Sequence, residues 1–168
     1  MSHENRMREL YDGCYRRLVG QLFAFCGDLT EAEDVVQEAF VRALAKPRTV
    51  ARVDNPEAWL RMVAVNIARR RFRRAARHRV LLARTDPPTS VPGLSADHVA
   101  LMTGLRRLPA EQREAIALFH VADLSVREIA ELVGVPQGTV KARLSRGRAR
   151  LAVLLDPYAD DAKEIDHV

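Results

Sequence analysis

The sequence has few aromatic residues and no run typical of a β-strand. Aromatic residues make up 5% of the 168 positions, and no stretch alternates β-branched with polar residues. This scarcity argues against a sandwich or barrel of strands and favours an all-α fold. The hydrophobic share of 48% is nevertheless sufficient for a packed core, which argues against wholesale disorder.

Cysteines and long apolar stretches are also scarce. Cys14 and Cys26 form no CxxC pair and are too few for a disulfide framework, and their helical spacing predicts small core residues. The longest charge-free apolar stretch, residues 19–27, is too short to span a membrane. Residues 1–8 are polar and lack the apolar segment of a signal peptide. We therefore expect no membrane insertion and a cytoplasmic location.

Acidic residues are outnumbered by basic ones. Lysine and arginine total 27 against 22 acids, which gives a net charge of +5. A basic balance indicates an anionic partner, most often nucleic acid. Composition leaves open a second interpretation, an arginine excess inherited from a GC-rich genome, because lysine occurs only at positions 46, 141 and 163.

Helical periodicity is strong in the first half of the chain. Apolar residues recur at helical spacing over residues 7–25 and again over residues 32–44. Thr30-x-x-Glu33 predicts a capping box at the start of the second of these helices. Residues 47–54 are expected to form a polar loop.

A third helix is expected to follow that loop and to end in a basic tract. Asn55 is a predicted cap, and Pro56 suits the first turn. Seven arginines lie within residues 69–79, and no acid offsets them. Residues 85–93 contain three prolines and one glycine, which cannot continue a helix and indicate an extended linker.

The second half has the pattern of a helix-turn-helix. Ser95 is a predicted cap, and Ser125-x-x-Glu128 predicts a capping box. The short helix behind that box is expected to end at Gly134 in a left-handed conformation, with a longer helix beginning at Pro136. A simple helical hairpin with a glycine turn is the alternative.

The last helix has an outward basic face suited to DNA. Five of the ten residues 141–150 are basic, and none is acidic. An α-helix fits the major groove, and its N-terminal residues reach base edges. The candidate base-reading residues are Gln137, Lys141, Ser145 and Arg146. The backbone amides of Gly138 and Thr139 can hold a phosphate. The alternative is a solvated basic face without a ligand.

Four segments of the chain, in order, resemble one known family. Residues 28–43 (DLTEAEDVVQEAFVRA), 55–70 (NPEAWLRMVAVNIARR), 108–114 (LPAEQRE) and 138–148 (GTVKARLSRGR) are similar to the motifs of bacterial sigma factors. Their order and spacing resemble those of the extracytoplasmic-function group, the smallest sigma factors. The resemblance implies two small helical domains joined by a flexible linker. The implied parts are residues 1–78 (core polymerase docking and −10 recognition), 79–95 (linker), 96–155 (−35 recognition) and 156–168 (acidic tail).

The resemblance also assigns roles to residues. It implies three groups of residues: one that docks on the clamp of core RNA polymerase, one that recognises the −10 element and one that recognises the −35 element. It also implies that residues 48–55 accept an extruded base. The docking group is Asp34, Gln37, Glu38 and Arg42. The −10 group is Arg61, Asn66, Arg69, Arg70 and Arg73. The −35 group is Gln137, Gly138, Thr139, Lys141, Ala142, Arg143, Ser145 and Arg146. Many members carry tryptophan where this chain has Leu44, a residue that the apolar periodicity places on the buried stripe.

Catalytic chemistry has little support in the sequence. The five histidines are scattered, and none has a cysteine or histidine at metal-ligand spacing. Asp34 and Glu38 share a helix face and could hold Mg²⁺, but no third acid, base or nucleophile accompanies them. We therefore expect no catalytic residues, no metal and no cofactor.

The predicted function is promoter selection by RNA polymerase. Its expected partners are core RNA polymerase and promoter DNA, and the sequence leaves open whether an anti-sigma factor is a third. One alternative is a stand-alone helix-turn-helix regulator whose N-terminal domain dimerises or senses a ligand. A further alternative is an interaction module with a vestigial DNA-binding helix.

Overall fold

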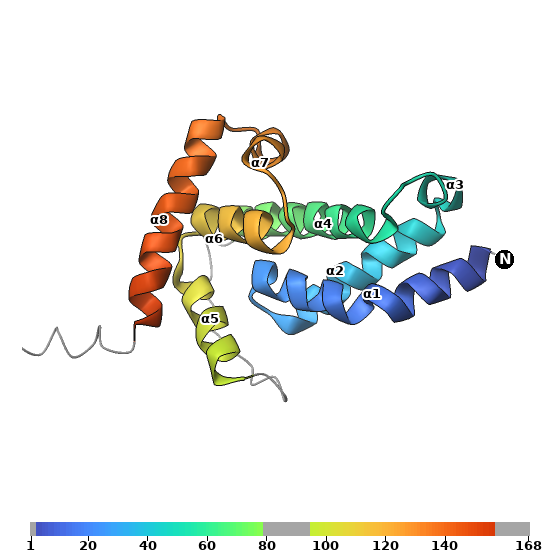
Figure 1. Ribbon diagram of the computed structural model, residues 1–168, viewed down its shortest axis with the longest axis horizontal. Coiled ribbons are helices and arrows are strands. Elements are labelled where there is room, and N and C mark those ends of the chain that lie inside the picture. Colours follow the sequence, from blue (N-terminus) through green and yellow to red (C-terminus); the bar gives the residue numbers. More distant parts are fainter. Residues whose placement is uncertain (1–2, 79–94, 157–168) are drawn as a thin grey trace, which may run out of the picture. The chain divides into compact units, whose positions relative to one another are not determined.

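The computed structural model describes residues 3–78 and 95–156, and every regular element in these ranges is a helix (Figure 1). The chain divides into two compact units, Met1–Ser90 and Val91–Val168. The all-α prediction with two helical domains is therefore confirmed. Apart from Ser95 and Asp156, the predicted linker and acidic tail lie outside the described residues, and the predicted domain boundaries stay predictions.

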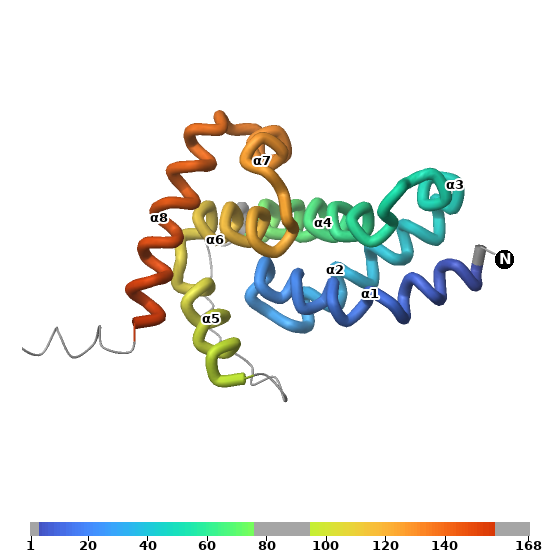
Figure 2. The backbone as a smooth tube through the Cα atoms, in the orientation of Figure 1, coloured from blue at the N-terminus to red at the C-terminus, as the bar shows by residue number. Residues whose placement is uncertain are grey.

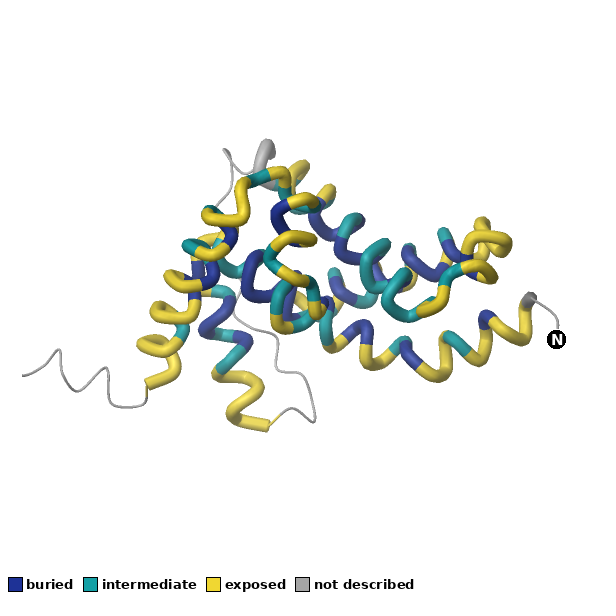
Figure 3. The backbone as a smooth tube through the Cα atoms, turned by 45° about the horizontal axis from the view of Figure 1, so that its top comes forward, coloured by how far each residue is buried: buried dark blue, intermediate teal, exposed yellow. Residues whose placement is uncertain are grey.

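The described part of the first unit, residues 3–78, contains three long helices and one short one. These are α1 (His3–Cys26), α2 (Leu29–Leu44), α3 (Pro47–Val50) and α4 (Pro56–His78). The helix α2 packs against both α1 and α4, and α1 also contacts α4. Leu18, Leu22, Val35, Val36 and Leu60 are almost completely buried and form the core. Figure 3 shows such buried positions along the inner sides of the helices.

The start of α2 differs from the prediction. Its N-cap is Asp28, whose carboxylate accepts a hydrogen bond from the Glu31 amide at 2.7 Å. The predicted cap Thr30 lies inside the helix, so the Thr30–Glu33 capping box is wrong. Asp28 caps as well as a threonine does, and it directly follows Gly27, whose φ of +72° ends α1. The next predicted cap is confirmed, since Asn55 Oδ1 accepts from the Ala58 amide at 3.0 Å.

The segment between α2 and α4 is not wholly irregular. The predicted polar loop 47–54 begins with one helical turn, α3, which Figure 2 shows between the two longer helices. Pro47 suits its first position because proline has no amide hydrogen to leave unpaired. Val50 is 3% exposed and fixes the turn to the core. An apolar anchor within a polar stretch therefore orders the segment.

Two sets of ion pairs tie α4 to the helices before it. Arg17 of α1 donates to both oxygens of Glu57 at 2.6 and 2.7 Å. Arg71 donates to Glu31 at 3.1 Å and to Glu38 at 2.7 Å, both on α2. The hydrogen bond from Arg17 lowers the pKa of Glu57 against the opposing effect of burial. Burial acts to raise the pKa of Glu38, but Arg71 and Arg42 outweigh it, and that pKa also lies below its ordinary value.

These lowered pKa values predict acid sensitivity of the first unit. A carboxyl whose folded pKa is depressed stabilises the fold above its ordinary pKa of 4.5. That stabilisation is lost as the pH falls through the lower folded value. The melting temperature should therefore fall as the pH is lowered from about 6 to about 3. This fall should be less steep for the variants Glu38→Gln and Glu57→Gln than for the unaltered chain, because each variant lacks one of the titrating carboxyls. Equal slopes in all three proteins would contradict this prediction.

The second unit contains the helix-turn-helix. Its elements are α5 (Ala96–Arg107), α6 (Ala110–Ile116), a π-helical turn (Ala117–Val121), α7 (Val126–Val133) and α8 (Gln137–Leu155). The predicted caps are confirmed: Ser95 accepts from the His98 amide, and Ser125 and Glu128 form a reciprocal capping box. Gly134 has φ +75°, so the left-handed turn between α7 and α8 is also confirmed.

The π-helical turn after α6 was not predicted. The Ala122 amide donates to the Ala117 carbonyl at 3.0 Å, five residues back. Such a turn holds one more residue than an α-helical turn, so it rotates the side chains that follow. Phe119 in this turn is half-buried, and the centre of its ring lies 5.2 Å from the Arg148 guanidinium.

Gly147 allows α6 and α8 to pack closely. A Cβ atom at this position would lie 2.7 Å from Ile116 Cδ1 and 3.3 Å from Gln112 Cβ. Any side chain here would therefore press against α6. The contact places the N-terminal parts of α6 and α8 beside each other, where the candidate DNA-reading residues lie.

Candidate nucleic-acid interface

The predicted −35 group occupies the part of the α8 surface that is turned away from the core. Val140, Leu144 and Gly147 face the core of the second unit. The remaining positions are turned outward to different degrees. Gln137, Gly138, Lys141, Ser145 and Arg146 are exposed, and Thr139, Ala142 and Arg143 are partly exposed. The fold therefore presents all eight residues along the N-terminal half of the helix.

A cleft of about 390 Å³ separates the beginning of α6 from the beginning of α8. Glu111 of α6 pairs with Arg143 across it at 3.4 Å, and the Arg143 side chain is only 18% exposed. Sequence reasoning did not connect these residues, since they lie in separate motifs. The lining residues are Pro109, Glu111, Gln112, Gly138, Thr139, Ala142, Arg143 and Arg146. Five cleft residues, those at 138, 139, 142, 143 and 146, also belong to the predicted −35 group.

The distal part of α8 is held by the π-helical turn. Arg148 Nε donates to His120 Nε2 at 3.2 Å, and the Arg148 guanidinium lies over the Phe119 ring. Burial and then the charge of Arg148 lower the pKa of His120, which favours the neutral imidazole that accepts this hydrogen bond. The orientation of Arg148 thus depends on the turn before α7.

The predicted −10 group is only partly on one face of α4. Asn66, Arg70 and Arg73 follow one another at spacings of four and three residues, so they share a face. Asn66 is half-buried, and Arg70 and Arg73 are exposed. Arg61 is half-buried on the other side of the helix. Arg69, which belongs to the same predicted group, is only 8% exposed and so does not share the outward position of Arg70 and Arg73.

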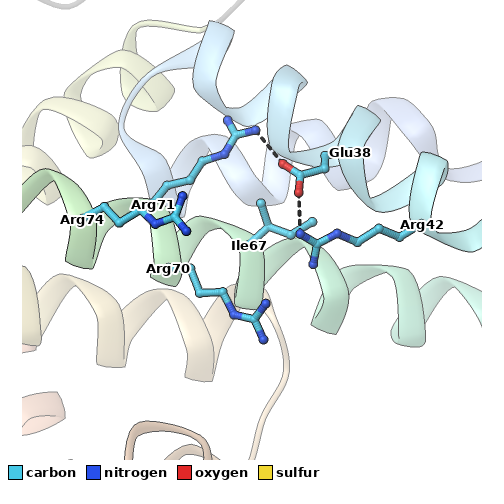
Figure 4. Close-up of a pocket in the computed structure, with 6 residues that line it drawn as sticks. All are labelled: Glu38, Arg42, Ile67, Arg70, Arg71 and Arg74. Atoms are coloured by element: carbon cyan, nitrogen blue, oxygen red, sulfur yellow. Dashed lines mark hydrogen bonds and ion pairs between the residues drawn. The ribbon is translucent and has the colours of Figure 1, made fainter.

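The predicted docking group on α2 also divides into two pairs. Asp34 and Gln37 are exposed, and Gln37 Nε2 donates to the Tyr15 hydroxyl at 3.4 Å. Glu38 and Arg42 pair with each other at the boundary with α4. Figure 4 shows Glu38 held from two sides, by Arg42 and by Arg71 of α4. The first pair is therefore open to a partner, whereas the second is engaged within the fold.

Two apolar residues complete the exposed side of α2. Val41 is 63% exposed and Leu44 is 49% exposed. The apolar periodicity placed Leu44 on the buried stripe, which is wrong, because α2 ends at this residue and its side chain remains largely exposed. Together with Asp34 and Gln37 these residues form the surface that we name the α2 face.

The segment predicted to accept a base has an open surface. Of residues 48–55, only Val50 is buried and Val53 is half-buried. Arg48, Arg52 and Asn55 are exposed, so the segment offers positive charge and hydrogen-bonding groups next to the start of α4. It contains no aromatic ring for stacking.

The described ranges contain neither a metal-binding cluster nor a helix that could span a membrane. In residues 3–78 and 95–156 no three histidine, cysteine, aspartate or glutamate side chains cluster so as to hold a metal ion. None of the helices in those ranges has both the length and the apolar character needed to cross a bilayer.

Comparison with family models defines the class of protein. Residues 10–78 match the model of sigma-70 region 2, and residues 98–151 match the model of sigma-70 region 4. These matches cover the α1–α4 unit and the helix-turn-helix unit respectively. The class is therefore that of the two-region sigma-70 factors.

Relatives place the chain within that class. It is 36% identical over 146 residues to the ECF RNA polymerase sigma factor SigL of Mycobacterium tuberculosis, with 82% of each chain covered. It is 31% identical over 159 residues to the ECF factor SigW of Bacillus subtilis, covering 85% of this chain and 81% of the relative. The chain belongs to the extracytoplasmic-function (ECF) family of RNA polymerase sigma factors.

Solved structures agree with this assignment. The sigma factor RpoE of Bartonella quintana, solved with the anti-sigma factor NepR, matches with a TM-score of 0.67 and 26% identity, over 93% of this chain and 99% of that one. CnrH, solved with the cytosolic domain of CnrY, matches with a TM-score of 0.57 and 27% identity, over 91% and 89%. The function is therefore promoter-specific initiation with RNA polymerase, and the stand-alone regulator is not favoured.

Proposed function

We propose that the α2 face binds core RNA polymerase. Asp34 and Gln37 supply polar contacts, and Val41 and Leu44 supply an apolar contact that polymerase would remove from water. Exposed apolar side chains beside polar ones are typical of a protein-binding surface. Glu38 and Arg42 border this surface and contribute where polymerase reaches the boundary with α4.

We propose further that α4 and the segment before it recognise the −10 element. Asn66, Arg70 and Arg73 face the DNA, and residues 48–55 hold an extruded base. Arg61 contributes from the flank of the helix. Arg69 supports α4 from within, because its burial leaves little of it to touch DNA.

The −35 element is assigned to α8. Gln137, Lys141, Ser145 and Arg146 reach base edges in the major groove, and Ala142 makes an apolar contact of the kind that thymine methyl groups accept. Gly138 and Thr139 offer backbone amides to a phosphate, and Arg143 adds its charge. The ion pair with Glu111 partly neutralises the charge of Arg143 and supports the proposal that it holds the Arg143 side chain in place before DNA is bound.

The relatives support a proposal for how this chain is regulated and where it acts. RpoE and CnrH were solved with NepR and CnrY, and we propose that an anti-sigma factor likewise holds this chain inactive. The chain acts in the cytoplasm with polymerase. It contributes no catalytic group and needs no cofactor or metal, because the polymerase supplies the chemistry.

One observation carries this proposal: the same chain has both an exposed α2 face suited to binding polymerase and an exposed helix α8 suited to reading DNA. Run-off transcription from fragmented genomic DNA, with purified core polymerase, tests it. Adding the chain should produce new discrete transcripts that share two different upstream elements. Absence of transcripts, together with failure to co-elute with core polymerase, would overturn the proposal. Binding of the chain alone to a palindromic site would instead establish a stand-alone regulator.

A further inference from the structure

A basic pocket lies between α2 and α4 of the first unit. Its volume is about 150 Å³. Four arginines and one glutamate surround it, with one apolar side chain between them. The lining residues are Glu38, Arg42, Ile67, Arg70, Arg71 and Arg74 (Figure 4). Such an excess of guanidinium groups around a cavity favours an anionic ligand.

The pairing of these arginines is uneven. Glu38 accepts from both Arg42 and Arg71, and Arg71 has Glu31 as a second partner. By contrast, Arg70 and Arg74 form no ion pair with any acid in residues 3–78 or 95–156, and both are exposed. Figure 4 shows Arg70 extending away from Glu38. The guanidinium groups of Arg42 and Arg71 are therefore held by ion pairs within the fold, whereas those of Arg70 and Arg74 remain available to bind a ligand.

The two available arginines are suitably placed to share one anion. They lie four residues apart on α4, so their side chains are neighbours on the helix surface, where like charges repel. An anion between them removes that repulsion. The planar guanidinium fork matches phosphate oxygens and can donate two parallel hydrogen bonds.

We propose that this pocket binds one backbone phosphate of promoter DNA through Arg70 and Arg74. The inference rests on the proposed function of α4, because Arg70 also belongs to the face formed with Asn66 and Arg73. A phosphate at the pocket would lie next to the bases that this face reads and would set the register of the helix on the duplex. Arg71 is a positioning residue that holds α4 against α2 through Glu31 and Glu38.

The first test measures salt dependence. Polymerase carrying the full chain is bound to a promoter fragment obtained from the run-off experiment, and its affinity is measured over a range of salt. Arg70→Gln/Arg74→Gln should weaken binding roughly tenfold at low salt and reduce the log–log salt slope by about 0.9, the value for one phosphate. The control Arg6→Gln/Arg16→Gln removes the same charge from exposed positions of α1 outside the pocket and should change neither quantity appreciably.

The second test locates the phosphate. Neutral methylphosphonates are placed singly through the fragment around the −10 element. The unaltered chain should lose roughly tenfold in affinity at one position, and Arg70→Gln/Arg74→Gln should lose nothing further there. The proposal would be overturned if the pocket and control variants had the same affinity and salt slope. It would also be overturned if methylphosphonates at every position weakened binding and did so equally in the pocket variant. If no methylphosphonate weakened binding but inorganic pyrophosphate bound to the pocket, the proposal would also be wrong, and the ligand would be a free phosphate compound.

The two levels of inference fail differently. If the unaltered chain directs transcription but the pocket variant matches its control, the phosphate site is wrong and the sigma function stands. If the unaltered chain directs no transcription, the proposed function itself fails. Thermal unfolding of each variant checks that the first unit remains folded.

Discussion

Replacing Val41 and Leu44 with aspartate should abolish tight binding to core RNA polymerase while leaving the fold intact. Both side chains are largely exposed, at 63% and 49%, so they contribute little to the core of the first unit. At an interface, each apolar side chain of this size is worth about 1.5–3 kcal/mol when fully buried, and a buried unpaired carboxylate adds a further penalty. We expect the dissociation constant to rise at least roughly 100-fold for Val41→Asp/Leu44→Asp. Titration of labelled chain with core polymerase measures it.

Conservative changes at the same positions provide the control. Val41→Ile/Leu44→Met keeps the apolar character and should bind within about threefold of the unaltered chain. Unchanged affinity of the aspartate variant, with thermal unfolding also unchanged, would show that polymerase does not cover this end of the α2 face. In that case Asp34→Ala/Gln37→Ala, which alters the polar end, would identify which part is covered.

The second large effect is expected at the DNA-reading helix. Lys141 and Arg146 are exposed on the outward side of α8, and neither takes part in an ion pair with an acid in the described ranges. A good base contact discriminates by about 1–3 kcal/mol, so Lys141→Ala/Arg146→Ala should lower −35-dependent transcription roughly 30-fold or more. The variant should also become insensitive to substitutions in the base pairs that these side chains read.

Arg150 offers a matched comparison on the same helix. It is exposed but lies farther from the helix N-terminus, where phosphates rather than bases are within reach. Arg150→Ala should weaken binding to all sequences uniformly and change the salt slope by about 0.9. If Lys141→Ala/Arg146→Ala behaved in the same uniform way, its residues would be backbone contacts and the assignment of base reading would be wrong.

Most local features of the fold were predictable from the sequence. The caps at Asn55, Ser95 and Ser125 and the left-handed Gly134 were identified correctly, because each depends on residues within a few positions. The start of α2 was misplaced since Asp28 and Thr30 are both good caps, and their local signals do not decide between them. The π-helical turn after α6 has no local sequence signal that distinguishes it from an α-helical turn.

The sequence by itself determined that the chain is helical, that it has two parts, and which segments bear the resemblance to sigma factors. Periodicity and capping are local, and the four motifs retain their order whatever the packing. Only the tertiary structure decided how individual side chains are used: Arg69 is buried, Arg71 is bound by two glutamates, and Arg70 and Arg74 remain available beside a pocket. Neighbouring arginines in a basic tract look alike in sequence. Because successive residues point about 100° apart around a helix, only the position of α2 against α4 distinguishes them.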